Sequence, residues 1–144
     1  MEMGDDSLAL KDFNKVLDID SANSSGYLFT GSLYYHFGNY DKAERLLKTA
    51  IQLNTKDSLA LFYLANLYFD EQKYSDAISY YTKTLEVNPN YKYVYLRRGS
   101  SYYNLGFYRQ AASDWDRAIR FEPSIYNSIK PLLNDARSKA GTKF

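Results

Sequence analysis

The sequence contains no cysteine, one histidine and only three prolines among its 144 residues. Without cysteine the chain can form neither a disulfide framework nor a thiolate metal site. Because His36 is the only histidine, the familiar pairings of a nucleophile with a general base are also missing. We therefore expect a protein that is not an enzyme and that needs no cofactor.

The sequence also lacks an excess of either charge and any long apolar run. Its formal net charge is +1, and the basic residues are scattered among acidic ones, so we expect no nucleic-acid partner. No apolar stretch approaches the roughly 18 residues of a membrane-spanning helix. The first residues, MEMGDDSLAL, lack the basic and apolar regions of a secretory signal. Together with the absence of cysteine, this favours a cytoplasmic location.

Tyrosine is the residue in excess, with 16 copies, and many of these copies recur at a fixed interval. Shifting the sequence by 34 residues lays one segment over the next, twice in succession. Similar residues then fall in columns: Gly31, Ala65 and Gly99; Tyr34, Tyr68 and Tyr102; Tyr40, Tyr74 and Tyr108; Ala43, Ala77 and Ala111. The chain is therefore a repeat protein.

This pattern resembles the tetratricopeptide repeat, a 34-residue pair of helices. The last full copy fills the family's positions with Tyr95, Gly99, Tyr102, Ala111, Trp115 and Pro123. The copies depart from the pattern at Thr30 and Arg98, which occupy a leucine position, and at Thr55, which replaces the closing proline. The resemblance covers residues 24–125 fully. It implies an all-α, right-handed superhelical solenoid of antiparallel helix pairs.

The small residues of the repeat support the same fold on physical grounds. Gly31, Ala65 and Gly99 would let the two helices of each pair approach closely. A single pair cannot cover its own apolar face, so stacked pairs share one core and leave a concave side. We predict these parts: 1–23, the second helix of a partial repeat or an N-terminal cap; 24–57, repeat 1; 58–91, repeat 2; 92–125, repeat 3; 126–144, a C-terminal capping helix and tail.

The two ends of the chain leave questions open. The helix expected over residues 5–20 lacks a partner helix, so the chain is either cut from a longer protein or capped there. The helix expected over residues 125–140 contains Pro131, which should kink it or delay its start. We expect the tail, 141–144, to be disordered.

In the family it resembles, the first helix of each pair lines the concave groove. That resemblance implies a protein-interaction module that binds a partner peptide or helix in an aromatic-lined groove. The predicted partner-binding residues are Phe29, Ser32, His36, Phe62, Tyr63, Asn66, Asp70, Tyr93, Arg97, Ser100 and Asn104. Tyr35, Phe69 and Tyr103 belong either to this groove or to the packing between repeats.

The sequence also bears on other partners and roles. A branch of the family captures acidic chaperone tails, but the matching positions hold Leu28, Ser32, Tyr63, Tyr93 and Arg97, and only Arg97 fits. An apolar or aromatic-containing partner segment is therefore expected. The alternatives are self-association through the open flank of the N-terminal helix, which would give a homo-oligomer scaffold, and service as the scaffold arm of a larger protein.

Overall fold

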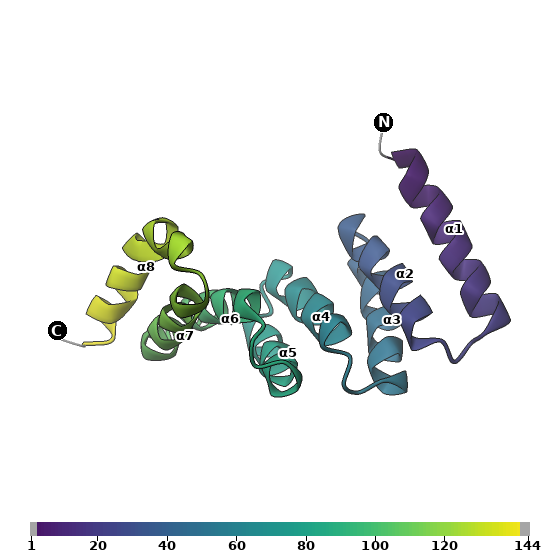
Figure 1. Ribbon diagram of the computed structural model, residues 1–144. Helices are drawn as coiled ribbons and strands as arrows, with labels where there is room; N and C mark the ends of the chain where they lie inside the picture. The colour runs from purple at the N-terminus through teal and green to yellow at the C-terminus, as the bar shows by residue number, and fades with distance from the viewer. Residues whose placement is uncertain (1–2, 142–144) are drawn as a thin grey trace. The chain divides into compact units, whose positions relative to one another are not determined.

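The computed structural model describes residues 3–141, which form eight α-helices, one short 3₁₀ turn and no strand (Figure 1). This confirms the all-α class expected from the sequence. The chain divides into two compact units, one ending at Leu67 and the other beginning at Tyr68. The boundary lies within one helix, α4 (Ser58–Asp70). Residues 142–144 of the expected tail lie outside the described residues.

The first unit contains α1 (Met3–Ile19), α2 (Ser24–His36), α3 (Tyr40–Leu53) and the start of α4. The α2–α3 pair is tight at Gly31, where an added Cβ would lie 3.0–3.2 Å from atoms of Leu46 and Leu47. Leu47 itself is fully buried. The small residue at this position therefore sets the distance between the two helices, as the repeat pattern predicts.

Helix α1 packs on α2. Phe13 stacks on Phe29, with ring centroids 5.4 Å apart, and Leu17 lies against Gly26, where a Cβ would come within 3.0 Å of it. On the outer side of α1, two large apolar side chains are exposed to solvent: Leu8 is 60% exposed and Ile19 is 88% exposed.

The second unit contains the end of α4 and then α5 (Tyr74–Val87), α6 (Lys92–Asn104), α7 (Tyr108–Phe121), a 3₁₀ turn (Pro123–Ile125) and α8 (Tyr126–Lys139). One buried core of this unit surrounds Trp115, which is 1% exposed and packs with residues of α6 and α8. A Cβ on Gly99 would lie only 2.7 Å from Cδ1 of this indole. Leu133 and Ala136 of α8 close the same core from the other side.

The three turns within the helix pairs share one geometry. In each, the second residue after the first helix has a positive φ: 75° at Gly38, 61° at Gln72 and 81° at Gly106. The hydrogen-bond pattern is the same too, with the next amide reaching back to a tyrosine carbonyl, for example from Lys73 N to Tyr68 O at 2.8 Å. These are Schellman turns. Glutamine thus takes a left-handed conformation that glycine adopts without steric cost.

Helices α2, α3 and α4 each begin after a polar residue whose side chain caps the helix. Asp57 caps α4, because its Oδ1 accepts hydrogen bonds from the Leu59 and Ala60 amides, each at 3.1 Å. Asn23 caps α2 in the same way through the Gly26 amide at 2.8 Å. Such caps satisfy amides that the first helical turn leaves unpaired.

Helix α8 continues through Pro131 rather than starting after it. The proline ring removes one amide donor, so the carbonyl of Asn127 loses its helical partner. Both residues are exposed, and water can satisfy that carbonyl. The buried side of the helix is carried instead by Ile129, Leu133 and Ala136.

Candidate functional site

The first unit carries a cluster of rings at the meeting of α2 and α4. Tyr63 lies edge-on to both Tyr35 and His36, with ring centroids 5.9 and 5.8 Å away. Phe62 is tilted against Tyr63 at 6.2 Å. The structure therefore brings together three of the predicted partner-binding residues, His36, Phe62 and Tyr63, and leaves His36 exposed and the other two half-buried.

The second unit carries a smaller cluster centred on Arg97. Its guanidinium lies over the Phe69 ring, 5.1 Å from the centroid. Its Nη1 is 3.9 Å from Oδ1 of Asp70. Two predicted residues, Asp70 and Arg97, thus meet at the end of α4, and 42% of the Arg97 side chain remains exposed. Cation–π contact holds the face of a guanidinium and leaves its N–H edge for other partners.

The remaining predicted residues divide by exposure. Phe29 and Tyr93 are 44% and 53% exposed, and Asn104 is exposed as well. Ser32 and Asn66 are buried, with 8% and 6% of their surface exposed. The Ser32 hydroxyl donates to its own helix, to Phe29 O at 2.8 Å. These two side chains offer little surface to a partner.

Two further polar residues on α6 are engaged within that helix. The Ser100 hydroxyl donates to Leu96 O at 3.1 Å, and the Asn104 amide donates to Ser100 O at 2.8 Å. Ser100 is half-buried. Neither bond crosses to another helix, so the outer parts of these side chains can turn to a ligand without breaking the fold.

Tyr35, Phe69 and Tyr103, whose placement the sequence left open, occupy equivalent positions at the three turns. Each ring packs on the tyrosine that starts the following helix: Tyr40, Tyr74 and Tyr108, at 5.8, 5.5 and 5.4 Å. All three are half-buried. They therefore seal the turn end of their own helix pair while keeping part of each ring at the surface.

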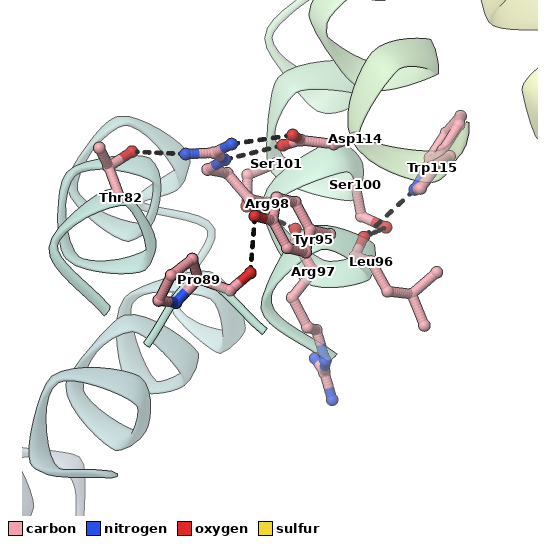
Figure 2. Close-up of polar contacts among 10 residues, drawn as sticks. All are labelled: Thr82, Pro89, Tyr95, Leu96, Arg97, Arg98, Ser100, Ser101, Asp114 and Trp115. Carbon is pink, nitrogen blue, oxygen red and sulfur yellow. Dashed lines mark hydrogen bonds and ion pairs between the residues drawn. The ribbon is translucent and has the colours of Figure 1, made fainter. Parts of the chain in front are cut away.

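The sequence did not predict the polar network around Arg98, which stands in the family's leucine position. Figure 2 shows its guanidinium between two helices: it binds both carboxylate oxygens of Asp114, at 2.7 and 2.8 Å, and donates to the Thr82 hydroxyl at 3.0 Å. Burial acts to lower the pKa of Arg98, but the hydrogen bonds and charge of Asp114 outweigh it and raise that pKa.

Near this network, hydrogen bonds to two backbone carbonyls hold one aromatic side chain of α6 and one of α7. The Tyr95 hydroxyl donates to Pro89 O at 2.9 Å, and the Trp115 indole donates to Leu96 O at 3.2 Å (Figure 2). Sequence spacing could not have paired Arg98 with Asp114, because the two residues meet only when α6 packs on α7.

Within residues 3–141 no group of three or more histidine or acidic side chains is placed to hold a metal ion. In the same range, no helix combines the length and apolarity that crossing a bilayer requires.

Comparison with known proteins identifies the family of the repeats. Two profiles described as tetratricopeptide repeat match residues 25–57 and 58–91. Tetratricopeptide repeat protein 6 of Homo sapiens is 32% identical over 98 residues, which are 68% of this chain and 19% of that protein. The chain thus spans about a fifth of the length of this curated relative.

Solved structures show the same fold. A crystal structure of MamA protein matches with a TM-score of 0.86 and 24% identity over 96% of this chain and 75% of that one. The first tetratricopeptide repeat domain of Spaghetti (RPAP3), bound to the HSP90 peptide SRMEEVD, matches with a TM-score of 0.76 and 22% identity over 85% of this chain and 97% of that one. The repeat pattern, the fold and these similarities together place the chain in the tetratricopeptide repeat family.

Proposed function

We propose that this chain is a protein-interaction module that holds a segment of a partner protein against the exposed rings of its first helices. The observation that carries the proposal is the ring cluster of His36, Phe62 and Tyr63, which presents aromatic edges beside a polar tip. Tyrosine and phenylalanine bury much area when a ligand covers them, and such residues dominate binding energy. The solved RPAP3 domain, which holds a peptide, supports a peptide-binding use of this fold.

The second unit carries a charged contact of its own that suits a partner segment. Arg97 is positioned by Phe69 and Asp70 and still has an exposed N–H edge. A partner carboxylate or backbone carbonyl could accept hydrogen bonds there, while Tyr93 offers a further exposed ring. We therefore propose a ligand segment that combines apolar or aromatic side chains with few charges.

A capture site for strongly acidic tails fits this surface poorly. Of the positions that would supply such a site, Leu28 is apolar and 5% exposed, and Ser32 is 8% exposed. Only Arg97 provides a cation. This favours the mixed aromatic surface over a carboxylate clamp in the predicted groove.

The test compares Tyr63→Ala/Arg97→Ala with a matched control, Arg45→Ala/Tyr126→Ala, which removes the same residue types from exposed positions on α3 and α8. Proteins retained by the parent and the control but lost by the first variant are identified, and one is purified for direct titration. We expect its affinity to fall about tenfold or more in the first variant, with helical circular dichroism unchanged. Equal binding by all three proteins would refute the assignment.

Self-association is a second candidate because the outer side of α1 exposes Leu8 and Ile19 at 60% and 88%. A second copy that covered these side chains would remove apolar surface from water. Light scattering over a concentration series tests this candidate. A mass that rises with concentration in the parent and not in Leu8→Lys would support it, and a constant monomer mass would exclude it.

A further inference from the structure

Helices α7 and α8 border a cavity of about 340 Å³ in the second unit, and its lining is dominated by arginine. Four arginines and one aspartate contribute to it, which leaves three uncompensated positive charges in a chain whose formal net charge is +1. The charged residues of the lining are Arg109, Asp116, Arg117, Arg120 and Arg137. The sequence suggests that basic residues are scattered, but on this face of α7 and α8 they are clustered.

Helical spacing and one ion pair create the cavity. Arg109, Asp116 and Arg120 are separated by seven and four residues, so they share one face of α7. Arg137 of α8 donates to Asp116 Oδ1 at 2.7 Å, which ties the two helices together across that face. Ala112 and Ala140 lie in the lining where longer side chains would fill the space.

Among the side chains that the structure describes, three of these arginines have no carboxylate partner. Among side chains of residues 7–141, no ion pair involves Arg109, Arg117 or Arg120, and all three are exposed. The guanidinium of Arg117 lies over the Tyr95 ring, 5.4 Å from its centroid. Stacking of this kind uses the face of the group and leaves its N–H donors free. The cavity therefore presents N–H donors and positive charge, and within its lining only Asp116 supplies a counter-charge.

We propose that this cavity is a second binding site, which takes an acidic segment of a partner protein. Arg109 and Arg120 are eleven residues apart on α7, which corresponds to about 16 Å along the helix axis. An extended peptide of about five residues covers that distance and can place several carboxylates along it. Arginine suits such a ligand because its planar guanidinium binds a carboxylate through two parallel hydrogen bonds.

The lining argues against a nucleic-acid strand at the same place. Single-stranded nucleic acids are usually bound by stacking bases on aromatic side chains along a basic groove. No aromatic residue lines this cavity, and Asp116 stands inside it. The site is also separate from the proposed ring surface, because it lies on α7 and α8 rather than on the first helices of the pairs.

The test uses a fluorescently labelled hexaglutamate peptide, with hexaglutamine as the neutral probe. We compare the parent with Arg109→Gln/Arg120→Gln and with a matched control, Arg45→Gln/Lys83→Gln, which removes two exposed cations from α3 and α5. We expect the cavity variant to bind hexaglutamate about tenfold more weakly and the control to change less than about twofold. Added salt should weaken binding to the parent.

The other outcomes overturn the proposal. Equal weakening in the two variants would mean that net charge, not the cavity, attracts the peptide. Equal affinity for hexaglutamate and hexaglutamine would remove the role of carboxylates. Stronger binding of a short single-stranded RNA than of hexaglutamate, lost in the cavity variant, would assign the site to nucleic acid.

Circular dichroism of each variant verifies that the helices remain, and Tyr63→Ala/Arg97→Ala should keep its hexaglutamate affinity.

Discussion

Arg98 and Asp114 form a bidentate ion pair between α6 and α7, with only 16% and 9% of their side-chain surfaces exposed. The pair replaces the apolar contact that leucine makes at this position in the family that the repeats resemble. A partly buried charge is costly unless its partner stays in place. The stability of the last repeat therefore depends on two residues whose joint removal should cost less than the sum of their separate removals.

Removing one partner of this pair should show that dependence. We expect Asp114→Ala to lower the free energy of unfolding by about 3 kcal/mol, because the Thr82 hydroxyl would be the one hydrogen-bond acceptor left to the Arg98 guanidinium among those described. Arg98→Leu/Asp114→Ala should be less destabilised than the sum of the single variants by about 2 kcal/mol. Urea unfolding of the four proteins gives this coupling energy. Additive effects would show that the ion pair contributes little.

The close approach at Gly99 should make even one methyl group destabilising. A Cβ there would meet Trp115, which is buried and held by its hydrogen bond to Leu96 O, so the indole cannot easily move. We expect Gly99→Ala to cost about 1–3 kcal/mol in unfolding free energy.

Gly31→Ala is the matched comparison for that variant. Its Cβ would meet the flexible end of Leu47 at 3.0–3.1 Å and Leu46 Cβ at 3.2 Å. The gain in helix propensity, about 1 kcal/mol, should offset much of that contact. Thermal melts would contradict this account if Gly31→Ala were the more damaging of the two.

The turn at Gln72 offers a stabilising change. Its φ of 61° lies in the left-handed region, where a side chain is unfavourable and glycine is not. We expect Gln72→Gly to raise the free energy of unfolding by about 0.5–1 kcal/mol, and Gly106→Ala to lower it by about 1 kcal/mol. Both residues are exposed, so changes in side-chain packing should contribute little to the change in free energy of unfolding. A loss of stability in Gln72→Gly would mean that the Gln72 side chain stabilises the fold by more than its left-handed backbone conformation costs.

Acid should loosen the attachment of α8. The Lys139 ammonium, 2.7 Å from Asp135, and the Tyr103 hydroxyl donate to that carboxylate and lower its pKa. A carboxylate whose pKa is lower in the folded than in the unfolded protein stabilises the fold at pH values above its ordinary pKa, about 4. This stabilisation disappears as the pH falls through the pKa that the group has in the folded protein.

The measurement is the melting temperature of the parent and of Asp135→Asn between neutral pH and about pH 3. The parent should be the more stable protein at neutral pH, and the difference should shrink as the pH falls below about 4. Glu86→Gln, which removes an exposed carboxylate from α5, controls for the change in net charge. A difference between parent and Asp135→Asn that persists in acid would contradict the assignment.

Much of the fold could be predicted because its determinants are local and repeat every 34 residues. The small residues Gly31 and Gly99, the cap at Asp57 and the turn glycines each act within one helix pair. The interactions that the sequence did not reveal join positions that no spacing rule connects. Arg98 finds Asp114, and Arg137 finds Asp116, only after α6, α7 and α8 have packed.

The candidate surface was predicted less completely than the fold. Helical periodicity indicates which residues share a face, but it does not show whether a neighbouring helix buries them. Ser32 and Asn66 were assigned in this way and are buried. His36, Tyr63 and Arg97 lie at helix ends or at ring contacts where part of the side chain stays in solvent. Their role in binding stays a prediction.

Trp115 is the only tryptophan in the chain, and it lies in the core of the second unit. Its fluorescence consequently reports on that unit alone, whereas far-ultraviolet circular dichroism averages over every helix. If the two units lose their structure at different denaturant concentrations, emission and ellipticity will give different midpoints. One built-in optical probe can therefore reveal whether the solenoid melts as a whole or in parts.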